Sequence, residues 1–239
     1  MKLIDLPHDA VATFVERPNR FLAIADIPTA DGVESIRQKV HVHDPGRLRE
    51  ILLPGSEIML KRATNPNRKT KWDLLSGKVD GRWVFIHSGH HRMISESLLL
   101  SDLNPFGTVT GMKAEVMVGN SRMDFVAEME YGGRLTIEVK GCSLARDGVA
   151  LFPDAPTERG TRHLRELMNV AQKGERAGLL SLVFRWDSEC FLPNGETDPK
   201  FESTFWEAMD SGMEYHAVKV EYDGSAIRYV GEIPLCGDR

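Results

Sequence analysis

The sequence has few cysteines and no long apolar run. Its three cysteines, Cys142, Cys190 and Cys236, are odd in number, widely spaced and without a Cys-x-x-Cys pair. This pattern suggests neither a disulfide framework nor a zinc knuckle, so we expect small buried apolar side chains. No apolar stretch reaches membrane-spanning length, and residues 1–5 show no signal-peptide core. We therefore expect a cytoplasmic protein with no membrane partner.

A large excess of one charge is also missing, because 30 Lys/Arg stand against 35 Asp/Glu in 239 residues. The charge is nevertheless uneven. Residues 1–86 carry 14 Lys/Arg and 11 Asp/Glu, a net charge of +3, and residues 87–239 carry 16 and 24, a net charge of −8. A basic half suits phosphate and an acidic half suits metal. Random unevenness is the alternative on so small a difference.

Short strands dominate the first half of the chain. Turn residues separate the segments, and a short helix with Leu48, Ile51 and Leu52 on one face is expected over 44–55. Short strands with a helix after the third are typical of an OB fold, a barrel that commonly binds oligonucleotides. We predict such a domain over residues 1–86. Its strands are expected at 10–16, 21–27, 35–42, 57–63, 72–79 and 83–87.

A basic loop over residues 61–72 joins two of these strands. It holds five cations and ends on an aromatic residue, a composition that suits a phosphate-tracking groove with a stacked base. A solvated hairpin loop is the alternative. The candidates for nucleic-acid contact are Arg68, Lys69, Lys71 and Trp72 in the loop, with Arg17, Arg20 and Arg47 as secondary candidates.

Two alternating runs around a glycine turn predict a β-hairpin in the second half. A three-residue loop over 131–133 places Lys140 opposite Asp124, with Glu138 on the same polar face. Two carboxylates are hard oxygen ligands for Mg²⁺ or Mn²⁺, with the Val139 carbonyl as a third, and a neighbouring ammonium can orient the attacking water. The hairpin therefore predicts a metal-dependent phosphodiesterase site. An ordinary amphipathic hairpin with a wet polar face is the alternative.

Three motifs between Ser121 and Leu167 carry a family resemblance. They are Ser-Arg-Met-Asp-Phe, Ile-Glu-Val-Lys-Gly-Cys-Ser-Leu and Ala-Leu-Phe-Pro-Asp-Ala-Pro-Thr-Glu-Arg-Gly-Thr-Arg-His. Together they resemble the sugar fermentation stimulation protein A family, and the resemblance extends more weakly over nearly the whole chain. It implies an OB-like N-terminal domain, a C-terminal half similar to the PD-(D/E)XK nucleases, and association with DNA. The family also carries a similar Asn-Pro-x-Arg-Lys-Thr in the basic loop.

Accessory site residues follow from the same resemblance. Nucleases of this type often supply another acid from the helix before the first strand, which here is Glu96; a solvent-facing glutamate is the alternative. Arg159 and His163 are four apart on a helix predicted over 157–173, so they share a side that could face phosphate, as the family motif Thr-Glu-Arg-Gly-x-x-His suggests. Asp154 could ligate metal or merely turn the chain.

The predicted element order of the second half is α-β-β-β-α-β-α-β. It fits a mixed α/β nuclease-like domain over residues 87–239, so the whole chain is expected to be an α+β or α/β protein. His41, His43, His87, His90 and His91 invite a metal interpretation. We decline that interpretation and assign the last three to a polar linker that marks the domain boundary, because the family usually has an Asn/Thr-rich turn there.

Two functions remain open. The acid–acid–lysine set favours a metal-dependent nuclease acting on DNA, or RNA, with little sequence preference. The family's name and its association with DNA favour a non-catalytic DNA-binding regulator of sugar metabolism that keeps a nuclease-like fold.

Overall fold

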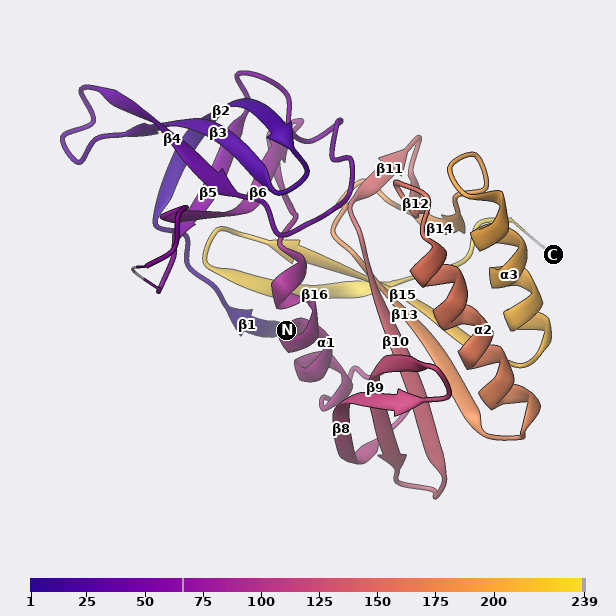
Figure 1. Ribbon diagram of the computed structural model, residues 1–239. Helices are drawn as coiled ribbons and strands as arrows, with labels where there is room; N and C mark the ends of the chain where they lie inside the picture. The colour runs from indigo at the N-terminus through magenta and orange to yellow at the C-terminus, as the bar shows by residue number, and fades with distance from the viewer. Residues whose placement is uncertain (66, 238–239) are drawn as a thin grey trace.

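The computed structural model describes residues 1–65 and 67–237 (Figure 1). Pro66, which belongs to the motif noted in the basic loop, and residues 238–239 lie outside the described part. The backbone forms a six-stranded sheet, a seven-stranded sheet and a small three-stranded sheet.

The six-stranded sheet forms the N-terminal domain, in the indigo and violet part of Figure 1. Its order is β4-β3-β2-β5-β6-β7, and a further pairing of β4 with β6 closes it into a barrel. The predicted OB-like barrel is therefore confirmed. Its strands are β2 (Ala10–Asn19), β3 (Leu22–Pro28), β4 (Ser35–His41), β5 (Glu57–Arg62), β6 (Trp72–Val79) and β7 (Arg82–Phe85).

The helix predicted over 44–55 is wrong. The segment makes one turn, in which the Leu48 carbonyl accepts from the backbone N–H groups of Ile51 and Leu52. Leu48 has a φ of 50°, which no helix tolerates, and the following Pro-Gly ends the turn. The predicted apolar face is nevertheless buried, because all three side chains pack in the core.

The seven-stranded sheet has the order β1-β16-β15-β13-β10-β9-β8. Its central strands β10, β13 and β15 are parallel and the outer pairings are antiparallel. β1 pairs with β16, so residues 2–5 of the predicted first domain lie in the second sheet. The strands are β1 (Lys2–Asp5), β8 (Val109–Val118), β9 (Ser121–Met129), β10 (Arg134–Cys142), β13 (Arg176–Val183), β15 (Glu214–Tyr222) and β16 (Ala226–Ile233).

Helices cover the two faces of this sheet, as Figure 1 shows. The 3₁₀ turn η1 (Ser88–His90) and α1 (His91–Leu99) lie on the barrel side, and α2 (Glu158–Gln172) and α3 (Pro199–Asp210) lie on the other. The Thr157 hydroxyl caps α2 by accepting from Gly160 N, as predicted, and Asp198 caps α3 by accepting from Phe201 N. The mixed α/β domain is therefore confirmed, with one apolar core on each face of its sheet.

A small sheet lies outside the predicted element order. It consists of β11 (Leu144–Arg146), β12 (Val149–Phe152) and β14 (Cys190–Pro193), in the order β11-β12-β14. Strands of three or four residues give too few alternations for a pattern to be detected. The sheet holds in place the segment between β10 and α2, which lines the cleft described below.

The expectation of buried free cysteines is confirmed for one of the three and wrong for the other two. Cys142 is a free, buried thiol, as expected, but Cys190 and Cys236 form a disulfide. The segment that follows β16 lies beside β14, where Phe191 N donates to Pro234 O and Cys236 N donates to Phe191 O. This long-range pairing brings together two cysteines that are 46 residues apart. Among the described residues, no helix is long and apolar enough to span a membrane.

Candidate metal centre in the cleft between the domains

The hairpin of β9 and β10 brings the predicted triad together. Arg134 pairs with Glu128 and Ile137 with Phe125, so the register differs by two residues from the expected one. An even shift keeps every side chain on its face, and Asp124, on β9, therefore stays on the face of Glu138.

Glu138 is the centre of the cluster. Its side chain is 2% exposed, and its Oε1 accepts hydrogen bonds from Lys140 Nζ and His163 Nδ1. Its other oxygen, Oε2, is buried and has no hydrogen-bond partner. A buried carboxylate oxygen without a partner is costly, by about 1–3 kcal/mol or more. This oxygen therefore has an unused site for a cation.

Asp124 stands beside it, half-buried. Its Oδ2 accepts a hydrogen bond from the Val139 backbone N–H at 2.7 Å. Burial, with the negative charge of Glu138 as the second cause, raises the pKa of Asp124 to about 6. Burial also pushes the pKa of Glu138 upward, but the Lys140 ammonium and the bond from His163 outweigh it and leave that pKa lowered. Glu138 therefore stays ionised, and the repulsion between the two carboxylates helps to raise the pKa of Asp124 instead.

His163 and Arg159 belong to this cluster through α2. Arg159 Nε donates to His163 Nε2 at 3.4 Å. Because that nitrogen accepts, the proton of a neutral imidazole sits on Nδ1, from which it is donated to Glu138. His163 is 2% exposed, so it orients the carboxylate, whereas the sequence predicted that it faces phosphate. Arg159 is exposed at the rim of the cleft.

Lys140 of this triad lines a cleft of about 450 Å³ between the two domains, whereas Asp124 and Glu138 are not among the described residues that line it. The barrel contributes Arg20 and the 44–46 loop, and the second domain contributes 139–144 and 151–157. Val139 and Lys140 thus lie on its wall, although the Val139 carbonyl as a metal ligand stays a prediction.

Asp154 ties the two walls of this cleft together. Its Oδ2 accepts from the Arg47 backbone N–H at 2.7 Å, and a Cβ on Gly46 would lie 2.3 Å from the same oxygen. Asp154 thus joins the domains, and its role as a metal ligand stays a prediction. Glu96, on α1, is not among the described residues that line the cleft, and its accessory role stays a prediction.

Sequence reasoning missed His91, the first residue of α1, which also lines the cleft. Its Nε2 is buried without a partner, and burial lowers its pKa to about 4. A Cβ on Gly141 would lie 2.1 Å from His91 Cε1, so only glycine fits after Lys140. A glycine inside a strand often marks such a close approach, and this was the signal available in the sequence.

The predicted nucleic-acid contacts of the barrel fall into two groups. Arg20, Arg47, Lys69 and Lys71 are exposed. Arg17 instead donates to four backbone carbonyls, those of Arg20, Asp44, Gly46 and Arg47, which holds the 44–47 loop in place.

Two of the loop residues have structural partners. Arg68 makes a two-bond ion pair with Asp73. Trp72 is only 5% exposed and the Arg62 guanidinium covers its ring at 4.5 Å. The expectation that Trp72 stacks on a base is therefore wrong, because no open ring face is left.

The chemistry of the donor set fits a hard divalent cation. Two carboxylates, one with a buried free oxygen, lie next to Lys140, which pairs with Glu138 and lines a solvent-connected cleft. Oxygen ligands with room for water are what Mg²⁺ and Mn²⁺ require.

Comparison with known proteins finds similarity over nearly the whole chain. Residues 15–86 match the model described as the SfsA N-terminal OB domain, and residues 89–226 match the sugar fermentation stimulation protein RE domain. A sugar fermentation stimulation protein homolog of Methanococcoides burtonii is 39% identical, with 98% of this chain and 95% of that protein covered. The Thermotoga maritima homolog is 41% identical, with 99% of each chain covered.

One solved structure covers both domains. It is described as Pyrococcus furiosus SfsA in complex with Ca²⁺, and it superposes with a TM-score of 0.87 over 98% of this chain and 99% of that chain, at 27% identity.

Proposed function

The chain belongs to the sugar fermentation stimulation protein family, and from this premise we propose that it is a divalent-metal-dependent phosphodiesterase that cleaves DNA. One observation carries the proposal. The buried Oε2 of Glu138 has no partner, although Asp124 and Lys140 stand beside it and Lys140 lines the open cleft. A group with a purely structural role would have its oxygens paired.

Asp124 and Glu138 would hold Mg²⁺ or Mn²⁺ through carboxylate oxygens. The relative from P. furiosus is described with Ca²⁺, another hard cation that takes oxygen ligands, and this supports the assignment. The ion, when bound, polarises the phosphate and makes a bound water more acidic.

The chain's own residues supply orientation and charge. His163 holds Glu138 in one orientation through its Nδ1–H, and Arg159 fixes the tautomer that can do so. Lys140 keeps its ammonium on the cleft wall, where it offsets the charge that develops on the phosphoryl oxygens. Arg20 and Arg159 reach the cleft from opposite domains and would bind phosphates on either side of the scissile one.

Incubation with single- and double-stranded DNA and RNA, in Mn²⁺ or in EDTA, tests the proposal. We expect cleavage of DNA in Mn²⁺ and none in EDTA. If the chain binds DNA but leaves it intact under all metal conditions, the non-catalytic regulatory interpretation holds instead. If RNA alone is cleaved, the reaction class stands and the substrate is wrong.

Phosphate contact by the cleft arginines gives a measurable salt dependence. In EDTA, where no cleavage occurs, the slope of log affinity against log salt should fall by about 0.9 for duplex DNA with each of Arg20→Ala and Arg159→Ala, because each lost phosphate contact releases fewer counterions. Fluorescence anisotropy over a salt series measures this. Arg134→Ala is the matched control, since Arg134 is exposed at the far end of the hairpin and pairs with Glu128. Unchanged slopes in the two cleft variants would contradict phosphate binding in the cleft.

The exposed Lys69 and Lys71 of the basic loop and Arg47 are proposed as further phosphate contacts outside the cleft. Arg68 is excluded from such a test because it holds Asp73, so its removal would disturb the barrel as well as any contact with DNA.

A further inference from the structure

Four histidines meet where the chain leaves the barrel. His41 and His43 come from the end of β4, and His87 and His90 follow β7. The ring centroids lie 4.3 Å apart for His41 and His43, 3.8 Å for His43 and His87, and 4.4 Å for His87 and His90. The sequence assigned His87 to a polar linker at the domain boundary; in the structure this residue is only 6% exposed.

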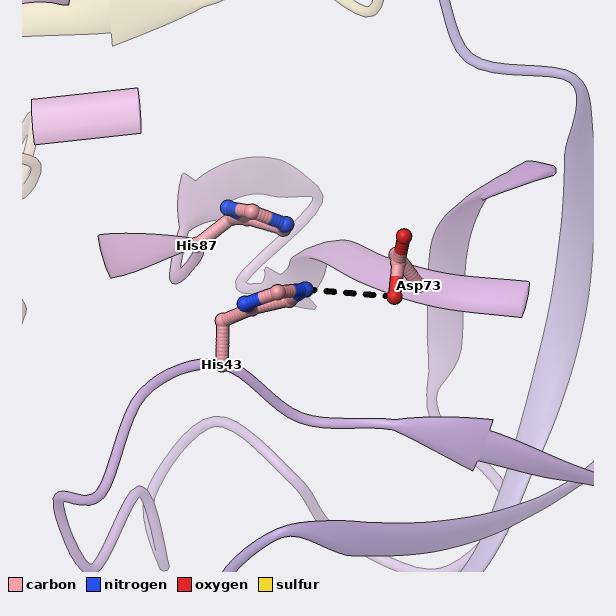
Figure 2. Close-up of side chains that lie close together, drawn as sticks. All are labelled: His43, Asp73 and His87. Atoms are coloured by element: carbon pink, nitrogen blue, oxygen red, sulfur yellow. Dashed lines mark hydrogen bonds and ion pairs between the residues drawn. The ribbon is translucent and has the colours of Figure 1, made fainter. Parts of the chain in front are cut away.

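A carboxylate completes the group, as Figure 2 shows. Asp73, on β6, accepts from His43 Nε2 at 3.2 Å, and one ligand atom each from His43, Asp73 and His87 lie within 4.8 Å of one another. Two ligands of a tetrahedral Zn²⁺ at about 2.05 Å stand roughly 3.3 Å apart. His43 and Asp73 therefore already have the separation of a ligand pair, and a cation can replace the proton between them.

A second, independent observation points to a ligand. His87 Nδ1 is buried and has no hydrogen-bond partner, although buried polar atoms are nearly always satisfied by protein, water or an ion. The turn is built close around this ring, since a Cβ on Gly89 would lie 2.9 Å from His87 Cε1 and 3.3 Å from its Nδ1. Ser88 Oγ donates to the His43 carbonyl at 2.8 Å and so joins the turn to the segment after β4 that bears His43.

Arg68 holds the carboxylate in place. It donates to Asp73 Oδ2 at 2.8 Å through one guanidinium nitrogen and to Oδ1 through the other. Each carboxylate oxygen can accept more than one bond, so Oδ1 can bind a metal while Arg68 holds both oxygens, and such partners orient ligands in many metal sites.

We propose that His43, Asp73 and His87 bind a second divalent cation of the Zn²⁺ type, separate from the carboxylate centre of the cleft. Two imidazoles and one carboxylate are borderline ligands that suit Zn²⁺, whereas Mg²⁺ and Mn²⁺ prefer oxygen. The fourth position is left to water or to His90.

The site would stiffen one wall of the cleft. His43 precedes Asp44 and His87 precedes Ser88, and both of these neighbours line the cleft. A cation bound across β4, β6 and the 87–89 turn would therefore fix the two barrel segments that face the second domain. The site would act as a structural clamp, and the proposal does not depend on catalysis.

Calorimetric titration with Zn²⁺ tests this in the full chain carrying Asp124→Asn and Glu138→Gln, so that the carboxylate centre is disabled. We expect one equivalent to bind, and a thermal transition that rises with Zn²⁺. His43→Gln and His87→Gln should each weaken binding by more than about 100-fold, since a lost ligand costs more than a lost orienting partner. His216→Gln is the matched control, because His216 also pairs with a carboxylate, that of Glu232, but lies outside the cluster.

Zinc X-ray absorption on the chain with its histidines intact adds a readout that does not depend on how the variants fold. We expect at least two imidazole ligands and one oxygen. The proposal is overturned if no stoichiometric Zn²⁺ binds, if His43→Gln and His87→Gln, checked for native circular dichroism, bind as tightly as their parent, or if the absorption spectrum contains no imidazole.

Discussion

Replacing Lys140 by Met is expected to lower the rate of DNA cleavage by about 100- to 1,000-fold while Mn²⁺ still binds. Removal of one preorganised charge from a site of developing negative charge typically costs this much. Metal affinity should stay the same or improve, because the ammonium that now occupies Glu138 Oε1 competes with the cation for that carboxylate. Single-turnover cleavage and Mn²⁺ calorimetry on the same variant separate the two effects.

Lys113→Met is the matched control for this experiment. Lys113 also lies on a strand of the large sheet, β8, but it is not among the described residues that line the cleft. We expect it to cleave at the wild-type rate. Equal rates for Lys140→Met and the wild type would show that Lys140 has no part in the chemistry, and the loss of both metal binding and cleavage would assign it to the metal centre alone.

Asp124→Asn is expected to make the metal-free protein more stable at neutral pH and to abolish Mn²⁺ binding. The folded-state pKa of about 6 lies above the ordinary value of 3.8, so the favourable contribution of protonated Asp124 is present below about pH 4 and is lost as the pH rises to about 6. Above that pH, charge repulsion with Glu138 remains, and Asn removes it. Asn can still accept from the Val139 N–H.

Thermal unfolding in EDTA between pH 4 and pH 8 measures this gain. The transition temperature should rise by roughly 2–4 °C for each kcal/mol of relief in a chain of this size, and the gain should vanish near pH 4. With Mn²⁺ at 100 times its dissociation constant, the order should reverse, because binding stabilises the wild type by about 2.7 kcal/mol. A variant that binds Mn²⁺ as tightly as the wild type would remove Asp124 from the ligand set.

Most strands of the two larger sheets were accessible to sequence reasoning, because they alternate, as β9 does, or form a continuous apolar run, as β13 does. The predicted hairpin register differs from the observed one by two residues. Asp124, Glu138 and Lys140 were still placed on one face, because an even slip preserves the face of each side chain. The prediction of a helix over 44–55 was wrong for a local reason. Its apolar spacing is helical, but Leu48 adopts a left-handed φ that only the finished fold imposes.

Long-range pairing accounts for most of the remaining errors. The disulfide joins β14 to the segment after β16, and the histidine cluster joins the ends of β4, β6 and β7. Neither follows from spacing along the chain. Trp72 was taken for a stacking platform because aromatic residues beside cations often are, but in the barrel the cation, Arg62, covers the ring itself.

Crystals grown with Mn²⁺ and measured at a wavelength where manganese scatters anomalously give the most direct test of the central claim. We predict one strong anomalous peak between Asp124 and the Oε2 atom of Glu138. The absence of a peak there at saturating Mn²⁺, or coordination by other residues only, would contradict the proposed metal centre.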